Sequence, residues 1–226
     1  MQNVLKGKII CFLGIDGSGK TTLANSFCAI LEKNAIPSKF IYGRYIPIFS
    51  RPFVIIGKGF FLRSSDIKKY SQYSNKKQDL AKQHSILIRF YTTIIILDYL
   101  IQVFLKIIIP RKMGKTIICD RYLYDTIIND IPRQENSTDS IRTMIDFYFR
   151  FIPKPDIVFF IDIPEKIAFS RKNDTPSIEY LTEKRSIYEN LGKIYRFHVL
   201  DGCKTKEDLI NKVTEDVFHE FNNKIA

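Results

Sequence analysis

The chain contains little cysteine, and its cysteines are not spaced for metal binding. Among 226 residues there are four, Cys11, Cys28, Cys119 and Cys203, which lie far apart and form no C-x-x-C pair. Cys11 and Cys119 fall in short apolar runs that are typical of central strands. We therefore expect buried thiols, not metal ligands or disulfides, and a reducing, cytoplasmic setting.

The sequence also lacks an arginine-rich tail, a nucleic-acid-binding motif and an internal repeat, although it is strongly basic. It has 35 Lys and Arg residues against 24 Asp and Glu residues, a formal net charge of +11. Such a charge predicts an anionic partner. Because the basic residues are spread along the chain, small phosphorylated ligands explain the charge better than a nucleic acid, and we expect no nucleic-acid partner.

No long hydrophobic run is free of charges. Residues 86–109, "ILIRFYTTIIILDYLIQVFLKIII", come nearest, but Arg89, Asp98 and Lys106 interrupt them. Each such charge costs about 2.5–3.5 kcal/mol at the middle of a membrane helix. The segment is therefore predicted to be a long buried helix, and no membrane span is expected.

Short β-rich apolar runs alternate with helix-length patterns along the chain. Such alternation favours an α/β fold with a parallel sheet and helices on both faces, because buried parallel strands appear as continuous apolar runs. With no visible boundary, residues 1–226 are expected to form a single domain. Residues 46–83 are the least regular and suggest a short helix plus a mobile loop. Strands are predicted at 8–13, 38–42, 116–119, 156–161 and 197–200, and helices at 20–34, about 82–112, about 138–151, 164–171, about 177–193 and 206–222.

A glycine-rich stretch carries the strongest functional signal. Residues 14–21, "GIDGSGKT", match G-x-x-x-x-G-K-[ST] in full, with a strand pattern before them and a helix pattern after them. Glycines let successive backbone N–H groups point at a phosphate, and the start of the helix adds partial positive charge. Lys20 would reach the β- and γ-phosphates, and the Thr21 hydroxyl would bind Mg²⁺. The predicted nucleoside triphosphate site comprises Gly14, Ile15, Asp16, Gly17, Ser18, Gly19, Lys20, Thr21 and Thr22.

A second stretch helps to decide which kind of phosphate-binding enzyme this is. In "TIICDRY", residues 116–122, Asp120 ends the apolar run and Arg121 follows at once. A carboxylate at the carboxyl end of a strand can hold Mg²⁺ or its water, and a guanidinium can clamp a phosphate. A local ion pair that stabilises a loop is the alternative interpretation. No N-K-x-D motif of a GTPase follows a strand and no D-E pair of a motor ATPase ends one, so a kinase is favoured.

These segments together resemble the thymidylate kinase family of nucleoside monophosphate kinases. "FLGIDGSGKTTL", "DRY" and "PDIVFFIDIPEKIAFSRK" occur in the family's order over nearly the whole chain. The resemblance implies a three-layer P-loop NTPase fold with a five-stranded parallel sheet, ATP and Mg²⁺ as cofactors, and a homodimer. It also implies transfer of the γ-phosphoryl group of ATP to a pyrimidine deoxynucleoside monophosphate in nucleotide biosynthesis, with dTMP as the expected acceptor.

The resemblance implies roles for individual residues as well. Asp16 matches an acidic residue that faces the acceptor, and Arg44 matches an arginine on the acceptor phosphate. "RKNDTPS", residues 171–177, resembles the mobile lid, so that Arg171 and Lys172 would bring positive charge to the transferring group. Asp201 lies in a segment that resembles the loop beside adenine. Arg44, Arg171 and Lys172 as plain surface charges are the alternative. The catalytic residues are expected to be Lys20, Arg121, Asp16 and Arg171.

The predicted long helix departs from the family pattern. Family members usually carry an aromatic residue and an arginine there that recognise thymine, whereas this chain has Asp98 and Tyr99 in "IIILDYL". At 100° per residue, Asp98 points away from the polar side chains of the preceding turns. We favour a role for Asp98 and Tyr99 in the acceptor pocket over a structural pairing of Asp98.

Because a carboxylate prefers a hydrogen-bond donor to thymine O4, two alternatives to thymidylate kinase stay open. One is a kinase of the same fold that acts on a sugar or another small metabolite. The other is a nucleotide-binding partner protein with little turnover, for which the apolar helix would be an interaction surface.

Overall fold

The chain folds into alternating strands and helices, seen in a computed structural model that describes residues 4–53, 85–131, 137–172 and 175–222. Its strands are β1 (Ile9–Leu13), β2 (Ser38–Tyr42), β3 (Thr116–Asp120), β4 (Ile157–Asp162) and β5 (His198–Asp201). Its helices are α1 (Lys20–Lys33), α4 (Ser85–Val103), the π-helical turn η1 (Phe104–Ile108), α5 (Ile109–Lys112), α6 (Leu123–Asn129), α7 (Thr138–Tyr148), α8 (Glu165–Ser170), α9 (Ile178–Tyr195) and α10 (Lys206–Asn222).

The five strands form one parallel sheet in the order β2-β3-β1-β4-β5. In its central register, Cys11 of β1 lies opposite Cys119 of β3 and Val158 of β4. Because all strands run the same way, their carboxyl ends meet at one edge of the sheet, which is where open α/β sheets bind ligands. The predicted α/β fold with a five-stranded parallel sheet is confirmed.

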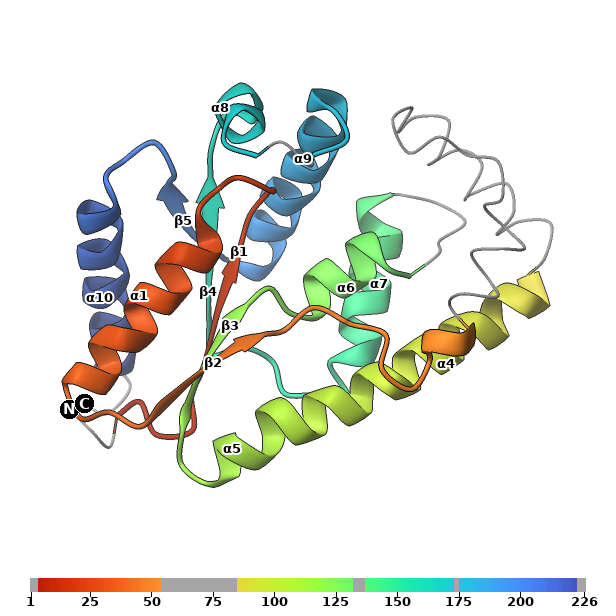
Figure 1. Cartoon of the computed structure of the whole chain (residues 1–226), viewed down its shortest axis with the longest axis horizontal. Coiled ribbons are helices and arrows are strands. Elements are labelled where there is room, and N and C mark those ends of the chain that lie inside the picture. The colour runs from red at the N-terminus through yellow and green to blue at the C-terminus, as the bar shows by residue number, and fades with distance from the viewer. Residues whose placement is uncertain (1–3, 54–84, 132–136, 173–174, 223–226) are drawn as a thin grey trace.

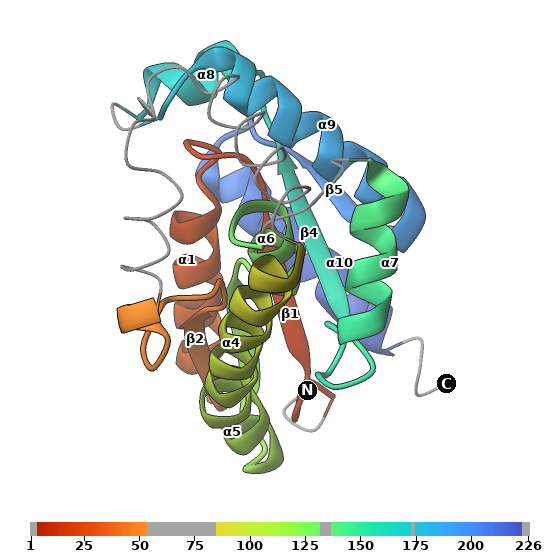
Figure 2. The same ribbon diagram turned by 90° about the vertical axis from the view of Figure 1, so that its right-hand side faces the viewer.

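Helices cover both faces of the sheet and give the fold three layers (Figures 1 and 2). Helices α1 and α10 pack on one face against Ile10 and Phe12 of β1, whereas α4, α6, α7 and α9 pack on the other against Ile9, Cys11 and Leu13. This alternation is the expected consequence of the period of two residues in a strand. Cys11 and Cys119 are buried free thiols, as predicted.

The long apolar helix is the main departure from the sequence-based expectation. It forms as α4, η1 and α5, but only 39% of its apolar window is buried, so one face lies on the sheet and the other is exposed. By length and composition alone, Arg89–Lys112 could cross a membrane, which is weak evidence because core helices pass the same test. The expectation that the whole helix is buried is therefore wrong.

Most predicted element boundaries fall within one or two residues of the observed ones. Helix α6, which begins two residues after Arg121, was not predicted. The expected short helix and loop at residues 46–83 lie mostly outside the described residues, which resume at residue 85.

Candidate active site

The glycine-rich segment, here called the P-loop (Gly14–Thr21), connects the central strand β1 to helix α1 at the carboxyl edge of the sheet. Gly17 has φ 86°, and a Cβ atom on it would lie 2.2 Å from the carbonyl oxygen of Ala168 in α8, so only glycine fits there. No side chain caps the first turn of α1, and that turn contains no acidic residue. Its backbone N–H groups can therefore bind an anion.

Lys20 is held inside this loop. Its side chain is buried, and Nζ donates a 3.0 Å hydrogen bond to the carbonyl oxygen of Ile15. Burial, followed by the positive charge of Arg121, lowers the pKa of Lys20 to about 8. Such an amine gains from a nearby phosphate, because the negative charge would offset the loss of water around the ammonium group. The Ser18 hydroxyl is also buried in the loop and has no hydrogen-bond partner among the described residues.

Thr21 and Asp120 form the part of the site that fits a magnesium ion. The exposed Thr21 donates from Oγ1 to Asp120 Oδ2 over 2.5 Å, and Thr22 is exposed beside it. The other carboxylate oxygen, Oδ1, is buried without a partner in the described part of the chain, and burial raises the pKa of Asp120. A nucleotide-bound Mg²⁺ takes most of its oxygen ligands from phosphates and water. From the protein it needs only a hydroxyl and a carboxylate that binds the ion directly or through a water, so Thr21 and Asp120 suit it. Within the described residues, no cluster of three or more His, Cys, Asp or Glu side chains offers a different metal site.

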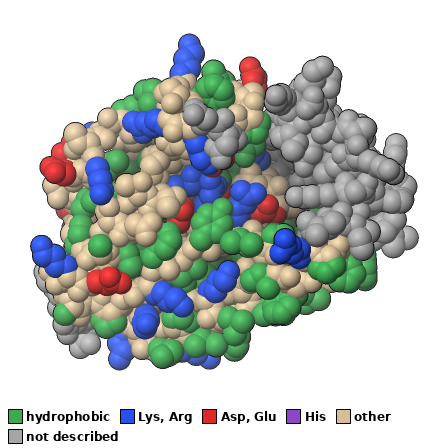
Figure 3. Space-filling model, viewed as in Figure 1, with side chains coloured by type: hydrophobic (Ala, Val, Ile, Leu, Met, Phe, Trp, Pro, Cys, Tyr) green, Lys and Arg blue, Asp and Glu red, His purple; other side chains and the backbone are tan. Residues whose placement is uncertain are grey.

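Asp16 lies at the centre of three cations. Its Oδ1 is 2.5 Å from Arg121 Nη2, 3.8 Å from Lys20 Nζ and 3.9 Å from Lys172 Nζ. Burial alone would raise the pKa of Asp16, but the charges of Arg121, Lys20 and Lys172 outweigh it and lower the pKa. Figure 3 shows basic and acidic side chains gathered at the middle of this face. The P-loop and the Asp120–Arg121 turn, a hundred residues apart in sequence, therefore share one charged centre.

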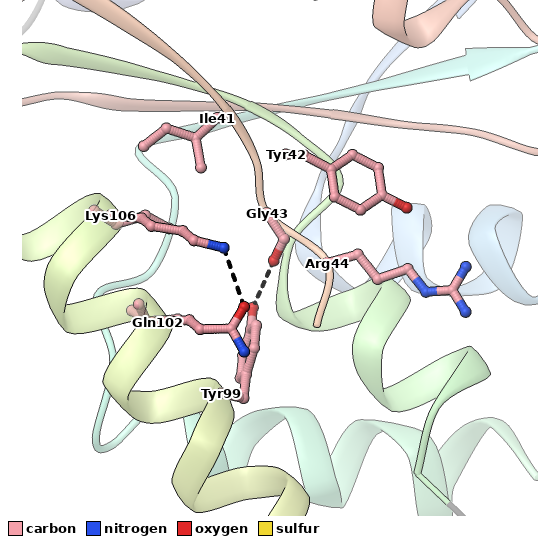
Figure 4. Close-up of a pocket in the computed structure, with 9 residues that line it drawn as sticks. Ile41, Tyr42, Gly43, Arg44, Tyr99, Gln102 and Lys106 are labelled. Atoms are coloured by element: carbon pink, nitrogen blue, oxygen red, sulfur yellow. Dashed lines mark hydrogen bonds between the residues drawn. The ribbon is translucent and has the colours of Figure 1, made fainter. Parts of the chain in front are cut away.

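The loop after β2 brings Arg44 to the same edge. Gly43 lies so close to the Asp120–Arg121 turn that a Cβ atom on it would be 2.3 Å from the Arg121 carbonyl oxygen. Arg44 donates from Nε and Nη2 to the two carboxylate oxygens of Asp130, over 2.8 and 2.6 Å, and this pairing keeps its pKa raised despite burial. Arg44 and Tyr42 project away from α4 (Figure 4).

Asp98 points into the protein, where it holds the loop that follows Arg44. Its Oδ2 accepts hydrogen bonds from Ile48 N at 3.0 Å, Ser50 N at 2.9 Å and Ser50 Oγ at 2.6 Å, and its Oδ1 accepts from Gln102 Nε2 at 3.0 Å. These contacts, against the opposing effect of burial, lower the pKa of Asp98. The carboxylate is thus occupied by this chain's own donors.

Tyr99 is likewise engaged by the chain itself. Its hydroxyl donates to the carbonyl oxygen of Gly43 over 3.0 Å, and its neighbour Gln102 accepts from Lys106 over 3.1 Å (Figure 4). These residues line a shallow hollow, open to solvent, between α4 and the loop after β2. Asp98 and Tyr99 therefore support the backbone on which Arg44 sits.

The remaining predicted residues lie around the same edge of the sheet. Asp201 ends β5, is exposed, and accepts a hydrogen bond from the Cys203 backbone N–H over 3.0 Å. Arg171 caps the carboxyl end of α8 and is exposed, whereas its neighbour Lys172 reaches Asp16. Residues 171–177, the expected lid, are described except for 173 and 174.

Three residues of the site were not found from the sequence. In the interior, Asp125 accepts hydrogen bonds from Arg121 and from the Tyr188 hydroxyl, and nearer the surface Asp130 pairs with Arg44. Asp125 follows Arg121 by four residues, a spacing that brings side chains together on a helix. This spacing could have revealed the contact between Arg121 and Asp125, but only if α6 had been predicted as a helix. The other two pairings join distant segments and leave no local pattern.

Sequence comparison identifies the family to which this arrangement belongs. A sequence model of the family described as "Thymidylate kinase" matches residues 68–213 of the chain. The chain belongs to the thymidylate kinase family. The predicted family membership is confirmed, and it makes the chain a nucleotide-binding transferase of the kinase class.

Individual thymidylate kinases resemble the chain over most of its length. It is 29% identical over 210 residues to a probable thymidylate kinase 1 of Saccharolobus solfataricus, an alignment that covers 91% of this chain and 94% of that one. It is 23% identical over 220 residues to the thymidylate kinase of Fervidobacterium nodosum, with 94% and 98% covered. Both alignments extend beyond the residues matched by the family model.

A solved structure supports the fold independently. The deoxyadenosine kinase of M. mycoides, determined with bound dATP, aligns with a TM-score of 0.51 over 93% of this chain and 98% of that one. The sequence identity is 21%, so the likeness concerns the fold alone. It supports the three-layer P-loop architecture.

Proposed function

We propose that the protein transfers the γ-phosphoryl group of ATP, with Mg²⁺, to a nucleoside monophosphate, and that dTMP is converted to dTDP. The observation that carries the proposal is the meeting of the P-loop with the Asp120–Arg121 turn. There Lys20, Arg121 and Lys172 surround Asp16, and Thr21 is joined to Asp120. Phosphoryl transfer requires two anions to be held in line while cations offset their charge, and this centre supplies those cations.

In the reaction, an oxygen of the acceptor phosphate bonds to the γ-phosphorus, and the bond to the β,γ-bridging oxygen breaks, so that ADP leaves with the electron pair. The P-loop amides and Lys20 bind the β- and γ-phosphates. Arg121 faces the transferring group and stabilises the charge on its oxygens. Thr21 and Asp120 would hold Mg²⁺, which would supply further positive charge to the phosphates.

Asp16 keeps these cations in place before the substrates arrive. Its low pKa means that it is ionised at neutral pH and pairs with Arg121 and Lys20. ATP and the acceptor bring several negative charges to the same point, and their phosphates replace Asp16 as the partners of these cations. Asp16 is then free to orient the acceptor. On the donor side, Asp201 would border the adenine, and Arg171, together with Lys172, would close over the phosphates.

Arg44 is proposed to bind the acceptor phosphate. Its Nε and Nη2 atoms donate to Asp130, and Nη1 is the guanidinium nitrogen that does not bind Asp130. Asp98 and Tyr99 would serve the acceptor indirectly, through the loop that carries Arg44. Because the Asp98 carboxylate is occupied by loop donors, it no longer argues for a sugar acceptor, and dTMP is the acceptor that the named relatives support.

We also propose that two copies form a homodimer through the outer face of α4 and its continuation. A stripe of large hydrophobic side chains lies exposed there, along the helix at the lower edge of Figure 3. Stripes of this size on a folded protein are usually covered by a partner. Its members are Phe90, Leu97, Ile101, Phe104, Leu105 and Ile109.

Sedimentation tests the dimer. Wild-type protein should sediment at twice the monomer mass, and Leu97→Glu should shift it to the monomer. Val199→Glu is the matched control, because Val199 is also an exposed hydrophobic residue but lies on β5, at the far edge of the sheet. A wild-type monomer at micromolar concentration would contradict the proposal.

A coupled assay tests the reaction itself. ADP release is measured with ATP and Mg²⁺ against dTMP, the other deoxynucleoside monophosphates, deoxynucleosides and simple sugars. Fast release with dTMP supports the proposal, and release with a sugar alone would replace it. Lys20→Met should lower turnover by about a hundredfold or more and leave the fold unchanged, because the loop loses its phosphate-binding cation. ATP binding with no acceptor-dependent turnover would indicate a binding protein instead.

A further inference from the structure

Arg121 has a backbone conformation that needs support. It has φ 68°, in the left-handed region, and its side chain is only 8% exposed. A non-glycine residue there costs on the order of 1 kcal/mol and persists only where the surroundings fix it. The Arg121 backbone N–H donates to the Phe12 carbonyl oxygen over 3.0 Å, which fixes the backbone but leaves the long side chain to other partners.

The two carboxylates that hold the Arg121 side chain differ in kind. Asp16 lies at the rim of the site and is shared with two lysines. Asp125, in the first turn of α6, is fully buried, and its Oδ1 accepts from both Arg121 Nη1 and the Tyr188 hydroxyl, the latter at 2.7 Å. Incoming phosphates can reach Arg121 Nη2 by displacing Asp16, but they cannot displace Asp125.

A buried carboxylate is a costly way to fill space. An apolar side chain would avoid the desolvation of a charge, and Asp125 Oδ2 even lacks a partner among the described residues. Tyr188, 1% exposed on α9, stays a hydrogen-bond donor because burial and the Asp125 charge raise its pKa well above normal. The cost is explained if Asp125 fixes the direction of the guanidinium.

The carboxyl end of α6 fixes the direction of the second arginine of the site, Arg44. Asp130 follows the last residue of α6 and binds Arg44 through two hydrogen bonds. The Thr126 hydroxyl, also on α6, accepts from the Tyr45 backbone N–H over 3.0 Å and so fixes the chain beside Arg44. One seven-residue helix therefore holds both arginines.

We propose that α6 is the positioning element of the active site: Asp125, supported by Tyr188, aims Arg121 at the transferring phosphoryl group, and Asp130 aims Arg44 at the acceptor phosphate. This inference rests on the proposed function. The two carboxylates touch no substrate and act through their arginines. Because those arginines serve different steps, the two carboxylates should affect different kinetic constants.

The test uses Asp125→Asn and Asp130→Asn in the full chain, with ATP, Mg²⁺ and dTMP, or the acceptor that the wild type turns over. Asp125→Asn should lower kcat by about tenfold to a hundredfold, with KM for ATP and acceptor within about threefold, because it removes transition-state stabilisation. Asp130→Asn should raise acceptor KM by about tenfold and leave kcat within about threefold. If both variants change kcat and KM alike, or if Asp130→Asn lowers acceptor KM, the proposal is wrong.

A matched control exists on the same face of the protein. Asp146 also pairs with an arginine, Arg142, and accepts from a tyrosine of α9, Tyr195, at 2.9 Å, but it lies on α7, away from the P-loop. Asp146→Asn should leave kcat and KM unchanged. If it lowers kcat as much as Asp125→Asn does, the effect of Asp125 does not depend on its contact with Arg121, and the proposal fails.

Two further measurements cover the cases in which Asp125→Asn does not fold or the wild type shows no turnover. If Asp125→Asn does not fold, Tyr188→Phe replaces it, since it removes one donor and should lower kcat by about threefold to tenfold; an unchanged kcat would overturn the proposal. If the wild type turns over no acceptor, the proposed function fails, and a crystal structure of Asp125→Asn still tests the support. Arg121 should then leave its position beside Asp125, and an unmoved guanidinium would overturn the inference.

Discussion

Thr21 and Asp120 are joined by a 2.5 Å hydrogen bond across the central strands, from the first turn of α1 to the end of β3. The two residues are 99 positions apart in the sequence. Their contact follows from the pairing of β1 with β3, because neighbouring parallel strands end side by side.

Replacing the Asp120 carboxylate should weaken the use of magnesium. Asp120→Asn is expected to raise the half-saturating Mg²⁺ concentration for turnover by about tenfold to a hundredfold, because a group that orients a metal ligand or its water is lost. Titration of Mg²⁺ at fixed ATP–acceptor concentrations measures this. Asp162→Asn is the control, since Asp162 also ends a strand, β4 on the other side of β1, but pairs with Arg185. Chelation should abolish wild-type turnover, and equal magnesium requirements in the wild type and Asp120→Asn would refute the role.

Nucleotide binding should take up protons in mildly alkaline solution. The free protein holds Lys20 with a pKa of about 8, so about half of the molecules carry an uncharged amine at pH 8. Phosphates favour the ammonium form, so ATP binding should take up as much as about half a proton at pH 8, and ATP affinity should fall as the pH rises further. Calorimetry in buffers of different ionisation enthalpy measures the uptake. Lys20→Met should show none from this position, and a wild type that matched it would contradict the assignment.

Asp98 should matter for the acceptor and not for ATP. Asp98→Asn weakens the hydrogen bonds to Ile48 and Ser50 that hold the loop after Arg44, which should raise acceptor KM by about threefold to tenfold with an unchanged ATP Kd. The free energy of unfolding should fall by about 1–3 kcal/mol. Ser50→Ala should produce a weaker version of both effects, and an altered ATP Kd in either variant would count against the loop-holding role.

The contribution of Asp98 should also depend on pH in a definite direction. Its pKa is lowered in the folded protein, so it binds protons less readily there than in the unfolded chain, where the pKa is about 3.9. Its stabilisation is therefore complete above about pH 5 and is lost as the pH falls through the folded-state value. The stability difference between the wild type and Asp98→Asn should narrow below about pH 4 in urea titrations. A constant difference would show that the charge of Asp98 is not what stabilises the loop.

Two P-loop glycines should differ in their tolerance of alanine. Gly17 and Gly19 have almost the same φ, 86° and 87°, but a Cβ on Gly17 would strike α8, whereas a Cβ on Gly19 meets nothing within 4 Å. Both substitutions strain the backbone, and only Gly17→Ala adds a clash. Gly17→Ala should therefore lower the free energy of unfolding by at least about 1 kcal/mol more than Gly19→Ala, which is roughly 2–4 °C in Tm. Equal melting temperatures would show that α8 yields easily.

The regular elements could be predicted because their signals are local. Strand β1 and the P-loop were predictable because a buried parallel strand is a continuous apolar run and the glycine pattern is fixed by phosphate geometry. Helix α6 was missed for the opposite reason. Leu123 to Ile128 are all buried, so the helix has no polar face and no period of 3.6 residues to detect.

Pairings across the fold could not be predicted from the sequence. The position of Asp98 opposite the polar side chains of its helix favoured a pocket over a structural pairing, because its hydrogen-bond partners, Ile48 and Ser50, lie about fifty residues earlier and leave no local pattern. The bidentate contact of Arg44 with Asp130 joins residues 86 positions apart. Likewise, a helix that is apolar on all sides does not reveal which face meets the sheet, and the exposed face of α4 was missed for that reason.

The position of β1 in the middle of the sheet has a consequence for how such proteins diverge. On one flank, β4 and β5 lead to the lid and to Asp201, which are assigned to ATP; on the other, β2 leads to Arg44, which is assigned to the acceptor, and β3 leads to the Asp120–Arg121 turn between them. Mutations in the segments that follow β2 therefore need not alter the segments that follow β4 and β5. A family member can thus evolve to use a new acceptor while its binding of ATP stays unchanged.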